Sequence, residues 1–215
     1  AQGVKMANKD LTVIASGGDG DGYAIGMGHT IHALRRNMNM TYIVMDNQIY
    51  GLTKGQTSPS SAKGFVTKST PKGNIEKNVA PLELALSSGA TFVAQGFSSD
   101  IKALTKMIED AIHHDGFSFV NVFSPCVTYN KVNTYDWFKE HLTSIDDIEG
   151  YDITDKQLAM KTVLDHESLV KGIVYQDTTT PSYESQISEL EHEALAKRDI
   201  HITEETFNDL TAQFL

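Results

Sequence analysis

The sequence predicts an α/β fold in which a parallel sheet with flanking helices is followed by a mainly helical C-terminal appendage. Up to about residue 130, short apolar runs alternate with amphipathic segments, a rhythm typical of βαβ units. Beyond that point strand-like runs become rare and acidic residues frequent. We therefore expect an α/β domain over residues 1–130 and an appendage over residues 131–215.

The first fifty residues predict one β-loop-α-β unit. Residues 11–15 (LTVIA) and 41–45 (TYIVM) are continuous apolar runs, typical of buried parallel strands. The helix between them, over residues 23–37, is expected to direct Ile25 and Leu34 towards the core. Parallel neighbours joined by a helix require a right-handed crossover.

The remaining elements follow from the same patterns. Residues 52–79 are polar, and loops of that length are usually functional lids or disordered. Further strands are expected over residues 91–95, 117–123 and 172–176. Further helices are expected over residues 81–88, 100–114, 137–142, 155–165, 183–198 and 204–214.

The composition excludes several classes of protein. Apolar residues make up 40% of the 215 positions and charged residues 21%, which is sufficient for a packed core under a solvated surface. The net charge of −10 argues against nucleic-acid binding, because no basic stripe is available for phosphates. No apolar run approaches the roughly 20 residues of a membrane span. A single cysteine, Cys126, is typical of a cytoplasmic protein.

Residues 17–22 (GGDGDG) form a loop directly after the first strand. The spacing departs from a dinucleotide fingerprint, because Ile25 stands where the third glycine should be. Two carboxylates would also repel a pyrophosphate unless a divalent cation lay between them, as Mg²⁺ does when it binds carboxylate and phosphate oxygens together. A calcium-binding EF-hand is excluded because Thr30, not Glu, occupies the twelfth position from Asp19.

Asn47 follows the second strand as Asp19 follows the first. Ligands of open α/β sheets bind at the carboxyl ends of the strands, so these two side chains could meet on one metal ion. Gly18-Asp19-Gly20 with an asparagine at this distance matches the thiamine-diphosphate signature.

Three motifs resemble the β subunit of 2-oxoacid:ferredoxin oxidoreductases. They are residues 17–23 (GGDGDGY), 46–56 (DNQIYGLTKGQ) and 124–128 (SPCVT), and the tail is also similar at residues 172–175 (GIVY). The resemblance implies a thiamine-diphosphate-binding fold in a heteromeric enzyme. That enzyme would decarboxylate 2-oxoglutarate or pyruvate to an acyl-CoA with an α subunit as partner. Electrons would pass through a [4Fe–4S] cluster to ferredoxin.

The resemblance also implies roles for particular residues. Mg²⁺ would be bound by the side chains of Asp19 and Asn47 and by the backbone carbonyl of Ile49. The α subunit would supply the carboxylate that activates the cofactor, so no catalytic acid or base is expected in this chain. Lys54 is a candidate partner for a second substrate carboxylate, the alternative being a solvated loop residue. The residues implied in cofactor binding are Gly18, Asp19, Gly20, Asp21, Asn47, Ile49, Gly51, Leu52 and Thr53.

In this family a cysteine at the position of Cys126 is the fourth ligand of the cluster. The other three come from a segment before the first strand that this sequence does not contain, so we expect a fragment that holds no cluster and is inactive alone. Two alternatives stay open. One is a thiamine-diphosphate decarboxylase or synthase without iron, and the other is a non-catalytic interaction fragment.

Overall fold

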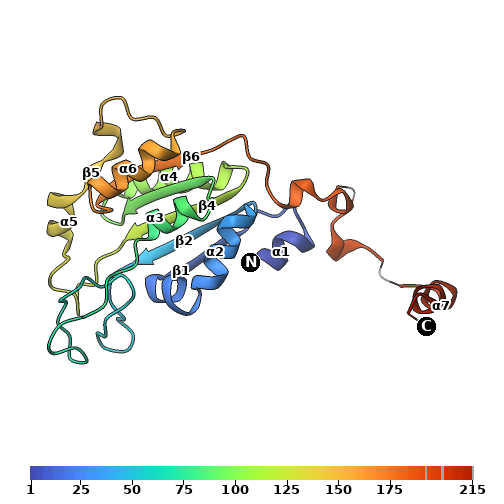
Figure 1. Cartoon of the computed structure of the whole chain (residues 1–215), viewed down its shortest axis with the longest axis horizontal. Coiled ribbons are helices and arrows are strands. Elements are labelled where there is room, and N and C mark those ends of the chain that lie inside the picture. Colours follow the sequence, from blue (N-terminus) through green and yellow to red (C-terminus); the bar gives the residue numbers. More distant parts are fainter. Residues whose placement is uncertain (192, 200, 215) are drawn as a thin grey trace.

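The computed structural model describes residues 1–191, 193–199 and 201–214, and its centre is a six-stranded sheet (Figure 1). The strands are β1 (Ile14–Gly18), β2 (Met40–Asp46), β3 (Phe92–Phe97), β4 (Phe117–Phe123), β5 (Thr143–Ser144) and β6 (Val170–Gln176). Their order in the sheet is β1-β2-β4-β3-β6-β5. The first four in that order are parallel, whereas β6 is antiparallel to β3. The predicted α/β class is confirmed.

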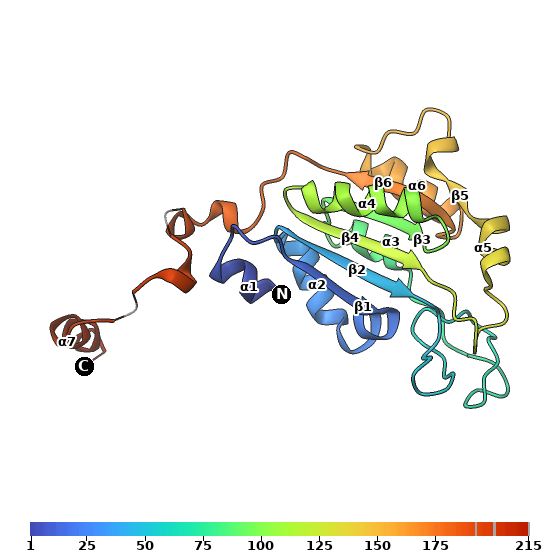
Figure 2. The same cartoon turned by 180° about the vertical axis from the view of Figure 1, so that it is seen from behind.

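Helices cover both faces of the sheet. In chain order the α-helices of the described residues are α1 (Gln2–Ala7), α2 (Met27–Arg36), α3 (Pro81–Ser87), α4 (Ile101–His113), α5 (Tyr135–His141), α6 (Lys156–Asp165) and α7 (Glu204–Ala212). One apolar core lies under α2, α3 and α6, and a second lies under α4 on the opposite face. The views from the front and from behind show α4 on the other side of the sheet from α2, α3 and α6 (Figure 2).

Alternation along the central strands builds both cores. In β3, Val93 packs on the side of α2, α3 and α6, whereas Phe92 packs on the side of α4. In β4, Phe119 and Val120 divide in the same way. This is the pattern of a strand buried on both faces, and it explains why these segments read as continuous apolar runs.

The start of the chain differs from the prediction in two respects. The first strand begins at Ile14 rather than at residue 11, and Leu11 is exposed. This strand lies at the edge of the sheet, where it pairs with β2 alone and Ile14 stands beside Thr41. It ends at Gly17 and Gly18, which were expected to lie in a loop. The helix begins at Met27, after a π-helical turn over Asp21–Ile25.

That π-helical turn explains a wrong core assignment. The Gly26 N–H donates to the Asp21 carbonyl at 2.8 Å, a wider loop than the α-helical bond. The extra residue rotates Ile25 outward, where it is 91% exposed, while Leu34 is buried as expected.

Most other predicted elements are confirmed with bounds that differ by no more than two residues, but the helix over residues 183–198 is wrong. Its described part forms short 3-10 turns. Glu184 is buried there, where its carboxylate accepts from the Asn39 N–H and faces Lys5 at 3.9 Å. These contacts hold the segment against the domain and override its helical periodicity.

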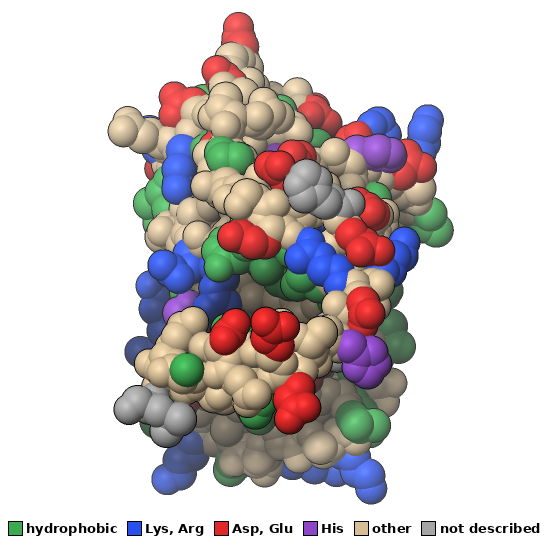
Figure 3. Space-filling model, turned by 90° about the vertical axis from the view of Figure 1, so that its right-hand side faces the viewer, with side chains coloured by type: hydrophobic (Ala, Val, Ile, Leu, Met, Phe, Trp, Pro, Cys, Tyr) green, Lys and Arg blue, Asp and Glu red, His purple; other side chains and the backbone are tan. Residues whose placement is uncertain are grey.

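The appendage is not separate from the sheet, because β6 lies beside β3 and Val163 of α6 belongs to the same core as α2. The division at residue 130 stays a prediction. Beyond β6 the chain leaves the sheet, and its last part forms an arm that ends in α7 (Figure 1). Acidic side chains face the viewer at this end of the molecule (Figure 3). Among the described helices, none has the length and apolarity that crossing a bilayer requires.

Candidate functional site

The two sequence motifs meet at one edge of the sheet. In the β1–β2 register Gly18 lies beside Met45, so Asp19 and Asn47 leave neighbouring strands at the same end. The loops are in direct contact, because a Cβ added at Gly20 would lie 2.1 Å from Cε1 of the Tyr50 ring. We call residues 18–23 the first loop and residues 46–56 the second loop.

Asp19 is the most unusual group of the first loop. Its side chain is 3% exposed, and Oδ2 accepts a hydrogen bond from the Ser58 hydroxyl at 2.5 Å. Burial raises the pKa of Asp19, while hydrogen bonds from Ser58 and from the backbone N–H groups of Gly20 and Asn47 oppose this rise. No ion pair reaches Asp19 within the described residues. A buried carboxylate in this state is suited to binding a cation.

The residues next to Asp19 in the first loop differ in burial. The Asp21 carboxylate is exposed and folds back to accept the Gly18 N–H at 2.9 Å. Gly20 is buried under Tyr50. Gly18, Gly20 and Asp21 therefore lie close to Asp19, where their predicted contacts with a diphosphate remain proposals.

The second loop is a tight turn held by its own side chains. Oδ1 of Asn47 accepts the Ile49 N–H at 3.0 Å, and Oδ1 of Asp46 accepts the Gln48 N–H at 3.2 Å. Gln48 has a φ of 59°, in the left-handed region that non-glycine residues rarely adopt. The Ser61 hydroxyl fixes this residue by donating to its carbonyl at 2.6 Å. The turn is therefore strained and well supported.

Asp46 was expected only as the first residue of the second motif, and no role of its own was predicted for it. It is 2% exposed, and burial together with the nearby charge of Asp19 raises its pKa to about 7. The Ser60 hydroxyl lies near Asp46, but in the described part of the chain it has no partner at hydrogen-bond geometry. The available sequence signal was an aspartate directly after the apolar run of residues 41–45.

The remaining predicted residues form the outer part of the second loop. Leu52 is 99% exposed, and the Thr53 hydroxyl contacts the Gln56 side chain. Lys54 is exposed with a φ of 74°, and it lines a cavity of about 430 Å³ together with Lys68. Leu52 therefore faces outward rather than towards Asp19.

The polar segment over residues 52–79 has no regular helix or strand, yet it is folded. Ser58, Ser61 and Asn74 are buried, and the Asn74 amide donates to the carbonyl of Ser61 at 3.1 Å. With Tyr23 and Tyr50 the segment lines a cavity of about 420 Å³. We call residues 57–79 the covering segment.

Cys126 lies beside the second loop. Its Sγ is 3.9 Å from the position of a Cβ added at Gly51, and the preceding Ser124 N–H donates to the Asp46 carbonyl at 2.8 Å. Cys126 is the only cysteine of the sequence, so the chain offers one of the four thiolates that a [4Fe–4S] cluster needs.

Magnesium fits the donors that are present. The described residues contain no group of three or more His, Cys, Asp or Glu side chains that could enclose a metal. Mg²⁺ does not need such a group, because it usually binds one or two protein carboxylates and takes other ligands from phosphate or water. A cation that brings its own phosphate ligands suits the oxygens present here. They are the buried Asp19 carboxylate, Oδ1 of Asn47 with its second lone pair, and the nearby Ser60 hydroxyl, which has no hydrogen-bond partner among the described residues.

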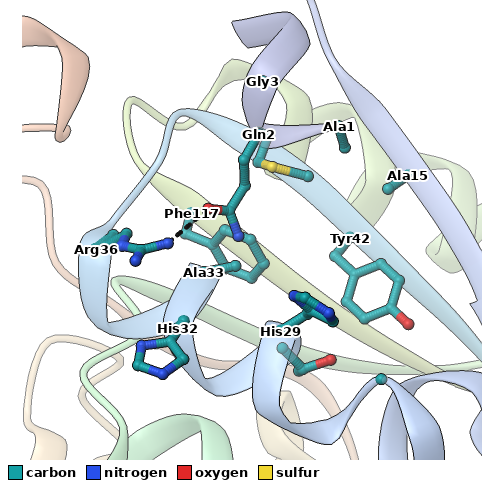
Figure 4. Close-up of a pocket in the computed structure, with 13 residues that line it drawn as sticks. Ala1, Gln2, Gly3, Ala15, His29, His32, Ala33, Arg36, Tyr42 and Phe117 are labelled. Atoms are coloured by element: carbon teal, nitrogen blue, oxygen red, sulfur yellow. Dashed lines mark hydrogen bonds between the residues drawn. The ribbon is translucent and has the colours of Figure 1, made fainter. Parts of the chain in front are cut away.

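Another cavity, of about 700 Å³, lies between α2, β2 and the start of the chain (Figure 4). It adjoins the first loop, because the Thr30 hydroxyl in its lining donates to the Gly22 carbonyl at 3.1 Å. His29, His32 and Arg36 of α2 line it together with Tyr42 of β2, and Arg36 donates to the Gln2 side chain at 3.1 Å. It contains none of the predicted site residues.

Comparison with known proteins agrees with these motifs. The family "Thiamine pyrophosphate enzyme, C-terminal TPP binding domain" matches residues 1–122, thiamine pyrophosphate being another name for thiamine diphosphate. A second family, the C-terminal region of the pyruvate ferredoxin oxidoreductase β subunit, matches residues 126–192.

Individual relatives carry the same description. The β subunits of the 2-oxoacid:ferredoxin oxidoreductases from Sulfolobus sp. and Saccharolobus solfataricus are 42% and 41% identical to this chain. The matched regions cover 87% and 88% of this chain, but 65% of each relative. A solved structure from Magnetococcus marinus, a 2-oxoglutarate:ferredoxin oxidoreductase with 2-oxoglutarate, coenzyme A and succinyl-CoA bound, is 36% identical with a TM-score of 0.86. That match covers 98% of this chain and 71% of the other.

Three observations point to the same family. They are the order of the motifs, the position of the two loops at neighbouring strand ends, and the extent of these matches. The chain belongs to the family of 2-oxoacid:ferredoxin oxidoreductase β subunits and contains the thiamine-diphosphate-binding domain of that family.

Proposed function

We propose that this chain binds thiamine diphosphate through Mg²⁺ as part of an enzyme that oxidatively decarboxylates a 2-oxoacid to an acyl-CoA. The observation that carries the proposal is the buried Asp19 carboxylate beside Asn47, in a region that matches a thiamine-diphosphate-binding family. The activity of the relatives supports the substrate class, as do the 2-oxoglutarate, coenzyme A and succinyl-CoA bound in the Magnetococcus marinus structure.

The cofactor roles divide between the two loops. Asp19 and Asn47 would bind Mg²⁺ by their side chains and Ile49 by its carbonyl. The other cofactor contacts proposed are those of Gly18, Gly20, Asp21, Gly51 and Thr53, whereas Leu52 faces outward and is proposed below as part of a partner surface. When bound, thiamine diphosphate supplies the carbanion chemistry for decarboxylation. The chain itself binds and orients the cofactor, and its covering segment keeps water from Asp19.

Lys54 is proposed to select the substrate. Every 2-oxoacid has a carboxylate at C1, but a dicarboxylic one such as 2-oxoglutarate brings a second negative charge. Lys54 is exposed in the second loop, with Lys68 in the same cavity, so positive charge is available beside the cofactor loops. A lysine there can pair with the distal carboxylate.

Partners complete the proposed site. Strongly exposed apolar side chains surround the two loops, as is typical of surfaces that contact another protein. They are Ile25, Leu52, Val66, Ile75 and Val127. We propose that these side chains are buried against an α subunit, that Cys126 binds a cluster with ligands outside this sequence, and that ferredoxin accepts the electrons. The proposed location of this enzyme is the cytoplasm.

Reduction of a viologen dye by the assembled enzyme tests this function. The complete β subunit, produced together with the proposed α subunit, should reduce methyl viologen only with both a 2-oxoacid and coenzyme A. The Asp19→Ala enzyme should be inactive. Decarboxylation without dye reduction would favour an iron-free decarboxylase. No turnover of any 2-oxoacid by a correctly assembled enzyme would favour an interaction role.

A further inference from the structure

Two buried amides interrupt the apolar core below the cofactor loops. Asn121 of β4 and Gln95 of β3 stand side by side in the sheet, and both are 0% exposed. The neighbouring residues on this face, Val44, Val93 and Phe119, are apolar. An amide in such a place destabilises the fold unless all of its donors and acceptors are paired.

Every polar atom of Asn121 has a partner. Its Oδ1 accepts the Tyr23 hydroxyl at 2.7 Å, and its Nδ2 donates to Gln95 Oε1 at 2.9 Å and to Asp46 Oδ2 at 3.4 Å. The Gln95 amide in turn donates to the carbonyls of Ser168 and Val170, each at 2.7 Å. The network is therefore anchored on backbone at the start of β6.

The other end of the network reaches both cofactor loops. Tyr23 belongs to the first loop and is 3% exposed. Asp46 opens the second loop, where its other oxygen holds the Gln48 N–H in the strained turn between Asn47 and Ile49. Asn121 thus contacts the first loop through a hydroxyl and the second through a carboxylate.

We propose that Asn121 is a positioning residue that holds the two loops at the separation needed to bind Mg²⁺ and thiamine diphosphate, an inference that rests on the proposed function. Asn121 touches neither ligand. It acts through Tyr23 and Asp46, as residues around a metal site orient the direct ligands. A leucine of similar size would fill the same space but would leave Tyr23, Asp46 and Gln95 without their shared partner.

The chain offers a matched control for this idea. At the opposite end of the sheet the Thr91 hydroxyl donates to Oδ1 of Asn37 at 2.7 Å, and both residues are buried. Tyr23→Phe and Thr91→Val each remove one buried hydroxyl that donates to an asparagine Oδ1, with little change in side-chain volume. The two variants therefore separate loop positioning from a general loss of stability.

The experiment compares these variants in the assembled enzyme. Calorimetry gives the dissociation constant of thiamine diphosphate at saturating Mg²⁺, and thermal unfolding without cofactor gives the midpoint. The Thr91 hydroxyl also lies 2.7 Å from Nε2 of His114, so we expect the unfolding midpoint of Thr91→Val to fall at least as far as that of Tyr23→Phe. We expect the dissociation constant of thiamine diphosphate to rise about tenfold in Tyr23→Phe and to change by less than about twofold in Thr91→Val.

Asn121→Asp is the second test, because it keeps the shape and the acceptor for Tyr23 but sets a carboxylate against Asp46. It should weaken cofactor binding more than Tyr23→Phe does. Cofactor binding by Tyr23→Phe and Asn121→Asp within about twofold of wild type would overturn the inference while leaving the proposed function intact. Failure of the wild-type enzyme to bind thiamine diphosphate would overturn both.

Discussion

The Ser58 hydroxyl donates to Oδ2 of Asp19 at 2.5 Å, with both side chains buried. Ser58 lies in the covering segment, so this one bond ties a long irregular stretch to the end of β1. The same carboxylate is the proposed ligand of Mg²⁺. Closure of the covering segment and cofactor binding therefore depend on one side chain.

Gly20→Ala should damage the site through contact between the loops. A Cβ at Gly20 would lie 2.1 Å from the Tyr50 ring, so the ring must move. We expect a loss of about 1–3 kcal/mol in the free energy of unfolding and weaker cofactor binding. Thermal unfolding and cofactor titration measure both quantities.

Gly28→Ala is the matched control, because nothing lies within 4 Å of a Cβ added there in α2. It should stabilise the helix by up to about 1 kcal/mol. Equal effects of the two substitutions would contradict the packing described for Gly20 and Tyr50.

Lys54→Ala should change substrate preference in the assembled enzyme. Loss of a desolvated charge-assisted bond of roughly 1.5–3 kcal/mol should lower kcat/KM for 2-oxoglutarate on the order of 10- to 100-fold, and much less for pyruvate. Lys63→Ala removes an exposed lysine of the covering segment and serves as the control. A uniform loss on both substrates would assign Lys54 to the common carboxylate or to the cofactor, and no loss would return it to solvent.

Cys126→Ser should separate iron from thiamine diphosphate. In the complete subunit it should destabilise the four-iron absorbance while leaving cofactor affinity unchanged, because Cys126 contacts the second loop without belonging to it. Anaerobic reconstitution of the 215-residue chain should give no four-iron absorbance, since its single thiolate falls short of four. A stoichiometric cluster on this chain would refute the ligand count.

Asp177→Asn should change the pH dependence of stability. Hydrogen bonds from the side chains and backbone of Thr179 and Thr180 lower the pKa of Asp177 to about 2. A lowered pKa contributes stability above the unfolded value near 4, and that contribution disappears as the pH falls through about 2.

The Asp177→Asn chain should therefore be less stable than wild type at pH 6, by about 1 kcal/mol after allowance for solvent screening. The difference should shrink between pH 4 and pH 2. Denaturant unfolding at several pH values measures it, and a constant difference down to pH 2 would disprove this role of the carboxylate.

The positions of the two loops could be predicted from the sequence because each follows a short apolar run. Asp19 and Asn47 had to emerge at one edge once β1 and β2 were parallel neighbours. Ser58 could not be predicted, since its polar segment has no periodicity and its contact with Asp19 is long-range.

Contacts between buried polar side chains also could not be predicted from the sequence. Gln95 and Asn121 lie within runs that read as strands, and nothing local indicates that they share a network with Asp46. The helix expected over residues 183–198 failed for a related reason, because Glu184 is drawn into a buried contact with Asn39. Tertiary contacts decided each of these positions.

Calorimetric titration of the assembled enzyme with thiamine diphosphate, with Mg²⁺ and then with EDTA, tests the central claim most directly. The account predicts binding that requires Mg²⁺ and is lost in Asp19→Asn, which removes the charge without changing the size. It also predicts unchanged binding in Asp115→Asn, an exposed carboxylate beyond α4 at the opposite end of the sheet. Binding that persists in EDTA, or equal binding by Asp19→Asn and wild type, would contradict the account.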